Sequence, residues 1–141
     1  MKYLLSIILG LSALCMSANE ISFNNEKVNY KVMYKWGLVN KQAGTATLSI
    51  TNHGANYITK LTAKSDPWAD NFYMVRDTLN GTIRKAGFLP LFYEKKAHEG
   101  GDFKHDIVKY SRNGNRVIGY CTRIKRDEDE SKESLESRLE V

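Results

Sequence analysis

Five side chains that could support acid–base or metal chemistry lie close together in this chain: His98, Glu99, Asp102, His105 and Asp106. Histidine nitrogen and carboxylate oxygen are both ligands that zinc accepts. The two histidines are seven residues apart across a Gly-Gly pair, however, and this spacing matches no familiar zinc motif. The pattern therefore favours a polar, solvated loop, and we expect no metal or other cofactor.

Asp77 and Glu99 are a second set of residues that could take part in a reaction, because paired carboxylates can act as general acid and base in hydrolysis. The sequence sets no distance between them. It contains no Gly-x-Ser-x-Gly motif, and Cys121 has no histidine partner in the sequence and is expected to be a small core residue. We therefore expect a protein that is not an enzyme. The alternative is a hydrolase that uses Asp77 and Glu99, or a metal held by His98 and His105.

Aromatic residues are numerous for a chain of this length. An ordinary β core explains most of them, and the alternative is an apolar groove inside a curled sheet that holds a lipid or another amphiphile. Trp36 and Tyr93 are the aromatic candidates for ligand binding. The residues concerned are Tyr30, Tyr34, Trp36, Phe72, Tyr73, Phe88, Phe92 and Tyr93.

The elements that must position these side chains are strands. From Val28 to Trp36, apolar and polar residues alternate, so the apolar ones share one face of a strand and would be scattered around a helix. Shorter alternating segments follow, separated by turn residues. Further strands are predicted at 43–51, 55–65, 72–79, 82–87, 89–96, 104–112 and 116–125.

The connections are predicted from glycine, proline and asparagine. Small residues at the start of the strand at 43–51 suggest a bulge or the close approach of another backbone. Asp66 and Pro67 suggest a capped helical turn near 66–71, and Asn80-Gly81 is the strongest short hairpin signal. Longer connections are expected at 37–42 and 97–103, and further turns at 52–54 and 113–115.

Together these segments predict an all-β fold, a curled antiparallel meander that forms an open barrel or β-roll. We divide the chain into a signal peptide at 1–18, an antiparallel β domain at 19–125 and an acidic tail at 126–141. The tail contains few apolar residues and many charges, so it is expected to be disordered or helical.

The first residues have the layout of a secretory signal peptide. Lys2 precedes an apolar run from Leu4 to Leu14, and small residues follow it. The run is too short for a bilayer, which needs about 20 apolar residues, so the mature chain is expected to lack a transmembrane segment. The periplasm or cell envelope is the expected location.

The net charge of +5 could suggest nucleic acid or an anionic lipid surface as a partner. The lysines alternate with apolar residues along the strands, however, which is typical of a solvated sheet face. Because an exported protein seldom meets nucleic acid, we expect instead a lipid, a glycan or an outer-membrane partner.

Several segments in a fixed order resemble an exported bacterial family, domain-of-unknown-function family 3108. They are YKVMYKWGLVNKQAGTATLSI, VRDTLNGTI, GFLPLFYEKKAHEGG and DIVKYSR, and they cover about residues 28 to 123. The matching positions are Gly37, Ala43, Gly44, Thr45, Arg76, Asp77, Gly81, Pro90, Leu91, Tyr93, Glu99 and Gly100.

The resemblance implies a curled antiparallel β architecture outside the inner membrane, and it implies no established activity. Arg76, Asp77, Tyr93 and Glu99 enter the candidate binding residues through this resemblance. It also hints that Asp77 and Glu99 serve the scaffold, Asp77 by bonding the following Asn-Gly turn. Family members look longer, so the chain is expected to be either a naturally short relative or a truncated or frame-shifted domain. The expected function is that of an exported, non-enzymatic β scaffold that binds an amphiphile, a glycan or an envelope partner.

Overall fold

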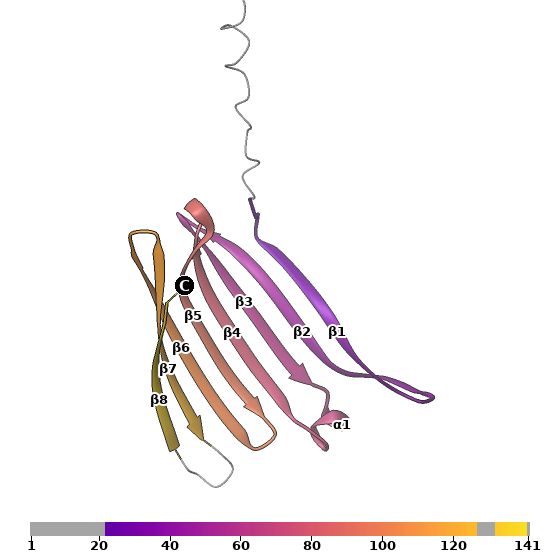
Figure 1. Cartoon of the computed structure of the whole chain (residues 1–141). Helices are drawn as coiled ribbons and strands as arrows, with labels where there is room; N and C mark the ends of the chain where they lie inside the picture. The colour runs from indigo at the N-terminus through magenta and orange to yellow at the C-terminus, as the bar shows by residue number, and fades with distance from the viewer. Residues whose placement is uncertain (1–21, 127–131, 141) are drawn as a thin grey trace, which may run out of the picture.

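The computed structural model of this protein describes residues 22–126 and 132–140. Within them, eight antiparallel strands follow one another in chain order and form one sheet, which confirms the predicted all-β meander (Figure 1). The predicted signal peptide at 1–18 lies outside the described residues. The strands are β1 (Glu26–Trp36), β2 (Val39–His53), β3 (Asn56–Ser65), β4 (Val75–Arg84), β5 (Leu89–Glu99), β6 (Asp102–Asn113), β7 (Arg116–Arg126) and β8 (Lys132–Glu140).

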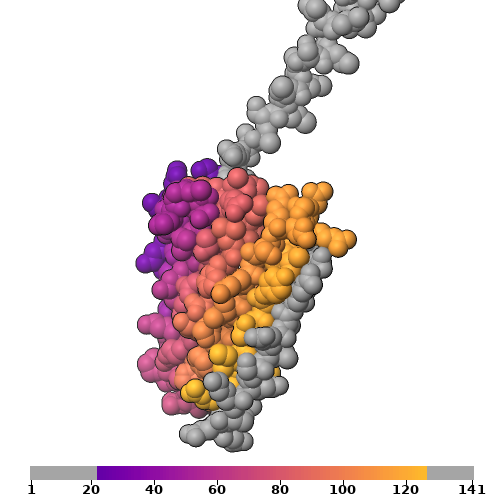
Figure 2. Space-filling model, turned by 90° about the vertical axis from the view of Figure 1, so that its left-hand side faces the viewer, coloured from indigo at the N-terminus to yellow at the C-terminus, as the bar shows by residue number. Residues whose placement is uncertain are grey.

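The sheet curls without closing, so β1 and β8 are the two edges of the part that the structure describes (Figure 1). Seen from the side, the strands cross the body obliquely (Figure 2). Directly opposed residues of antiparallel strands share a face, so the register sorts the side chains into two sets. One set, here called the apolar face, includes Val28, Tyr30, Val32, Leu48, Ile50, Tyr57, Leu61, Leu79, Tyr93, Val108 and Cys121.

The opposite face carries the lysines that the alternation pattern placed in water. Lys27, Lys31, Lys60 and Lys64 lie on it and are exposed. The hollows described below border the apolar face, as expected for the concave side of a curled sheet. Only three apolar residues among those described are buried, namely Tyr57, Ala97 and Ile118. The sheet is therefore a single layer whose concave face is not covered by another layer of the described chain.

The start of β2 contains the bulge and the close backbone approach that its small residues predict. The register between β1 and β2 shifts between Val32 and Met33, which leaves Ala43 as the extra residue. A Cβ added to Gly44 would lie 2.5 Å from the carbonyl oxygen of Lys64. A glycine is therefore needed where β2 and β3 come closest.

Aromatic side chains close both ends of the apolar face. At one end Tyr57, which is 3% exposed, stacks on Phe88 at 6.0 Å and meets the edge of Phe23 at 5.5 Å. Phe88 ends the short 3-10 helix η2 (Ala86–Phe88) between β4 and β5. At the other end Tyr34 of β1 meets Trp68 of the helix α1 (Pro67–Asp70) at 6.3 Å.

Helix α1 is held to the sheet by a set of bonds that differs from the prediction. Pro67 is at its start as expected, but the Asp66 side chain makes no cap hydrogen bond and accepts one from Gln42 instead. Trp68 Nε1 donates to the Gln42 carbonyl oxygen at 2.7 Å. The predicted cap is wrong because Gln42 at the β1–β2 bulge provides a partner for Asp66.

The predicted hairpin turn at Asn80–Gly81 is wrong. Strand β4 passes through both residues, and the two strands predicted at 72–79 and 82–87 both overlap this one strand and extend beyond its two ends. A Cβ on Gly81 would collide with Thr59 Oγ1 of β3. This glycine therefore serves close packing inside a sheet rather than a turn. The chain reverses later, at Gly87, where φ is 75°.

The loops predicted at 37–42 and 97–103 are also wrong, because the strands extend into them. Four of the connections, β1–β2, β2–β3, β5–β6 and β6–β7, are two-residue turns that each begin with a glycine of positive φ. Such turns match the twist of the strands that they join. The predicted turns at 52–54 and 113–115 are confirmed within a residue or two. The four glycines are Gly37, Gly54, Gly100 and Gly114.

The acidic tail differs from the expectation of disorder or helix. Residues Lys132–Glu140 form β8, which pairs antiparallel with β7 from Ile118 to Arg126. The unpaired edge of β7 supplies hydrogen-bond partners that the composition of the tail does not reveal. The structure therefore continues the meander by one strand, while 127–131 lie outside the described residues.

Candidate functional site

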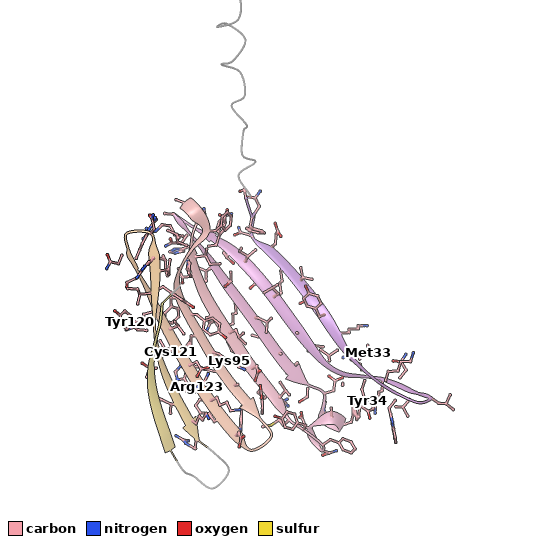
Figure 3. The ribbon with its side chains drawn as sticks, viewed as in Figure 1. Met33, Tyr34, Lys95, Tyr120, Cys121 and Arg123 are labelled. Atoms are coloured by element: carbon pink, nitrogen blue, oxygen red, sulfur yellow. The ribbon has the colours of Figure 1, made fainter. Side chains whose placement is uncertain are left out.

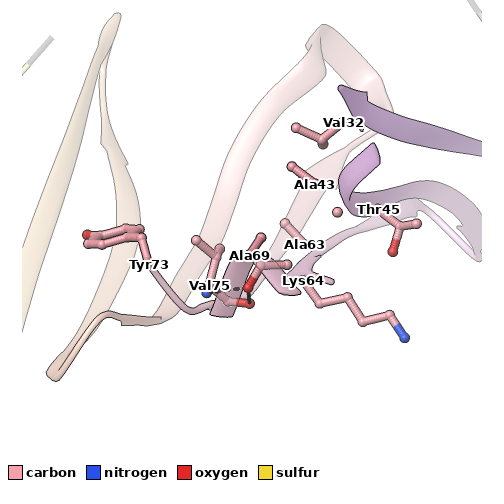
Figure 4. A pocket seen from close by; sticks show the side chains of 10 residues that line it. Val32, Ala43, Thr45, Ala63, Lys64, Ala69, Tyr73 and Val75 are labelled. Carbon is pink, nitrogen blue, oxygen red and sulfur yellow. Dashed lines mark hydrogen bonds between the residues drawn. The ribbon is translucent and has the colours of Figure 1, made fainter. Parts of the chain in front are cut away.

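Two adjoining hollows lie on the apolar face beside α1. One has a volume of about 350 Å³ and is lined by aromatic and alanine side chains, including Tyr34, Trp68, Phe72 and Tyr73. The other, shown in Figure 4, measures about 210 Å³ and reaches over β1 to β4, from Val32 to Val75. Because both are lined by Ala43, Ala69 and Tyr73, they form one continuous depression, here called the groove.

Charged side chains interrupt the apolar face over β4 to β7. We call Asp77, Lys95, Glu99, Asp106 and Arg123 the charged cluster. The register places Lys95 opposite Asp106, and Asp106 opposite Arg123. Figure 3 shows Lys95 and Arg123 in this part of the sheet. Lys95 Nζ also lies 3.8 Å from Glu99 Oε1, so positive and negative groups alternate across the cluster.

The ion pair of Asp106 and Arg123 is the best-buried part of the cluster. Arg123 Nε donates to Asp106 Oδ1 at 2.6 Å and Nη2 to Oδ2 at 2.7 Å, while Asp106 is only 8% exposed. These bonds lower the pKa of Asp106. Bidentate pairing of this kind fixes both side chains in one geometry.

The structure brings Asp77 and Glu99, the predicted carboxylate pair, close together. Burial raises the pKa of Asp77, and the negative charge of Glu99 raises it further. Asp77 Oδ1 is buried and has no hydrogen-bond partner among the described residues. Two carboxylates in such a setting favour a shared proton, which is the condition that general acid–base chemistry uses. Asp77 does not bond a following turn, since β4 continues past it.

Tyr73 links the groove to the charged cluster. Its ring lines both hollows, and Tyr73 Cε2 lies 3.3 Å from the position of a Cβ on Gly100. Gly100 follows Glu99 directly in the turn between β5 and β6. The groove therefore ends near the carboxylate pair.

The remaining predicted binding residues lie in three different places. Tyr93 is on the apolar face, opposite Gly81 and Val108, and burial raises its pKa. Trp36 is 74% exposed at the end of β1, and no cluster residue is opposite it. Arg76 belongs to the opposite face and reaches around the strand end.

Arg76 has a structural contact that explains its position. Its Nη2 lies 2.6 Å from Asp70 Oδ2, and its Nη1 donates to Asp70 Oδ1 at 3.1 Å. The Ser65 hydroxyl also donates to Asp70. Hydrogen bonds from Arg76 and then Ser65 lower the pKa of Asp70. Arg76 therefore holds α1 against the end of β3, beside the groove.

The two histidines of the alternative metal site lie on the face opposite the apolar one. His98 is exposed, whereas His105 Nε2 lies 2.9 Å from Glu94 Oε1. Asn80 donates to the other oxygen of Glu94 at 2.9 Å. Bonds from Asn80, His105 and Lys96 lower the pKa of Glu94 to about 2. Among the described residues, no group of three or more His, Cys, Asp or Glu side chains is placed to hold a metal ion.

Tyr34, Phe72 and Tyr73 were among the aromatic residues considered for a groove, whereas sequence reasoning missed Lys95, Arg123 and Trp68. A usable signal existed for the ion pair, because Asp106 and Arg123 are each eight residues from the turn Gly114–Asn115 and so face each other in a symmetric hairpin. The many aromatic residues suggested a groove as the alternative to an ordinary core, but its position beside α1 had no local signal, since α1 meets the sheet through contacts between distant segments.

The fold and the site define a single-layer, curled antiparallel sheet with a groove and a charged cluster on its concave face. A family model described as "Protein of unknown function (DUF3108)" matches residues 29–138, and the chain belongs to this family. The resemblance read from the sequence is thus confirmed. Neither the curated proteins nor the solved structures compared with the chain give a significant match. No helix in the described part of the chain is long and apolar enough to cross a lipid bilayer.

Proposed function

We propose that this protein is an exported component of the cell envelope that binds an amphiphile in its groove without catalysing a reaction. The observation that carries the proposal is the uncovered apolar side of a one-layer sheet. A sheet normally buries its apolar side against a second layer, and large exposed apolar patches mark interaction sites. Tyr30 and Val32 are each 49% exposed on this side.

The shape of the face suits a slender ligand. A hydrocarbon chain fits a curved depression lined by side chains, as in β-barrels that hold one small ligand. The groove supplies this depression along α1, β2 and β3. The charged cluster beyond Tyr73 supplies partners for a polar head group. A narrow apolar site with a few polar groups at one end is the usual form of a small-ligand site.

Ligand extraction and groove blocking test this proposal together. Protein purified from the envelope fraction is extracted with organic solvent and analysed by mass spectrometry, and binding of a fluorescent single-chain fatty acid is measured. Ala63→Trp fills the groove and should abolish both signals. Thr62→Trp changes the neighbouring residue on the opposite face of β3 and should leave them intact. A wild-type protein that yields no lipid and does not bind the probe contradicts the proposal.

Export is tested separately by cell fractionation. The complete chain should accumulate in the envelope fraction, and a chain that lacks residues 1–18 should remain in the cytoplasm. Equal cytoplasmic retention of both chains would contradict export.

Hydrolysis by Asp77 and Glu99 is a second candidate function, favoured by the raised pKa of Asp77 beside a second carboxylate. A broad screen of ester and glycoside substrates should then show activity that the Asp77→Asn/Glu99→Gln double variant lacks. Activity that survives in the double variant would exclude this mechanism.

A further inference from the structure

The hairpin of β1 and β2 extends beyond the rest of the sheet (Figure 1). Apolar residues at its end are exposed. Leu38, in the turn, is fully exposed, and Trp36 beside it is 74% exposed. Val39, opposite Trp36 in the register, is 49% exposed. These three residues, here called the tip, have no core to fill and lie outside the groove.

Basic residues surround the tip. Lys35 directly precedes Trp36, and Lys31 lies four residues before Lys35 on the same strand. Lys41 follows on β2, and all three lysines are exposed. The sequence from residue 27 to 65 contains no aspartate or glutamate. The hairpin is therefore a cationic projection with an apolar end.

We propose that the tip is a docking element that inserts into the surface of an anionic lipid bilayer. Tryptophan favours the interface between head groups and hydrocarbon, and leucine favours the hydrocarbon below it. Basic side chains at that depth meet anionic head groups and strengthen binding. Because residues 27 to 65 contain no acidic side chain, this part of the hairpin would not be repelled by an anionic surface.

The position of the tip suits a protein that handles amphiphiles, although the docking proposal does not depend on that function. Tyr34, two residues before Trp36, contacts Trp68 at the wall of the groove. Docking through the tip would therefore bring the aromatic end of the groove towards the bilayer surface.

Vesicle sedimentation with the purified full chain tests the docking. We expect binding to vesicles of phosphatidylcholine mixed with phosphatidylglycerol, and much weaker binding to phosphatidylcholine alone. Lys31→Glu/Lys35→Glu should weaken the binding by about tenfold or more, because each basic residue near the surface contributes about a fivefold factor. Lys60→Glu/Lys109→Glu makes the same change of charge on exposed strand positions away from the tip and should have little effect.

The apolar part of the tip is tested by a variant with its own control. Leu38→Asp should abolish sedimentation, whereas Asn115→Asp adds the same charge in the exposed turn between β6 and β7 and should not. In a Trp68→Phe background Trp36 is the only tryptophan, and its emission should shift to the blue on binding. The proposal is overturned if the wild-type protein does not sediment with anionic vesicles. It is also overturned if the two control variants lose binding as fully as the tip variants.

Discussion

Arg123 and Asp106 face each other across β6 and β7 and form two charge-assisted hydrogen bonds of 2.6 and 2.7 Å on the concave side of the sheet. Asp106 is 8% exposed, and it is the only buried charged residue within residues 22–126. A one-layer sheet thus places a strong ion pair where a two-layer protein would place aliphatic side chains. The pair supports both the hairpin and the charged cluster.

Removal of Arg123 should destabilise the fold more than its partial exposure suggests. Arg123→Ala leaves the Asp106 carboxylate buried without its partner, which costs about 2 kcal/mol of unfolding free energy. Urea unfolding followed by circular dichroism measures the change. Arg126→Ala, at an exposed position of the same strand, is the control and should unfold like the wild type. Equal midpoints for both variants would show that the pair contributes nothing.

Acid should weaken the protein through Glu94. Its pKa in the folded protein, about 2, lies below its pKa in the unfolded chain. The stability that Glu94 adds to the fold is therefore fully present above the unfolded pKa. This contribution is lost as the pH falls from about 4.5 towards 2. Glu94→Gln should therefore have a flatter dependence of unfolding free energy on pH over that range. Lys96→Gln, which removes only one of the bonds to Glu94, should lie between the variant and the wild type.

Asp77 should have the opposite effect on the pH dependence. Burial and Glu99 raise the pKa of Asp77, so folding favours its protonated form. The stability that this form contributes is lost as the pH rises through the folded pKa. Asp77→Asn should therefore stabilise the protein at neutral pH and have less effect in mild acid. Thermal unfolding at the two pH values measures this difference. A loss of stability at neutral pH would show that ionised Asp77 has partners in the folded protein.

Gly81 provides a test of the path of β4. Gly81→Ala directs a methyl group at Thr59 Oγ1 and should cost about 1–3 kcal/mol, as overpacking does. Combination with Thr59→Ala should recover much of the loss, because the colliding group is then absent. The unfolding free energies of the two single variants and the double variant form the measurement. If Gly81→Ala is neutral on its own, β4 does not pass Thr59 as described.

The two glycine-containing pairs Asn80-Gly81 and Gly100-Gly101 show where local sequence signals fail. Asn80-Gly81 has the composition of a hairpin turn, yet Asn80 bonds Glu94 and Gly81 accommodates Thr59 from a neighbouring strand. Tertiary contacts therefore override the turn preference. The sequence predicts a longer loop at 97–103, whereas Gly100-Gly101 forms a tight turn because the strands on both sides pair up to it.

The chain by itself determined the all-β class, the meander, the lysine-covered face and the family, because period-two alternation and turn residues act between neighbours in sequence. The sequence also identifies Asp77 and Glu99 as a candidate carboxylate pair, but it does not show that they lie close together. Only the tertiary structure decided the bulge partner, the groove under α1, the pairing of Lys95, Asp106 and Arg123, and the conversion of the tail into β8. These features depend on which strand edges and side chains meet across the sheet, and such contacts are set by the register of the whole sheet rather than by any local segment.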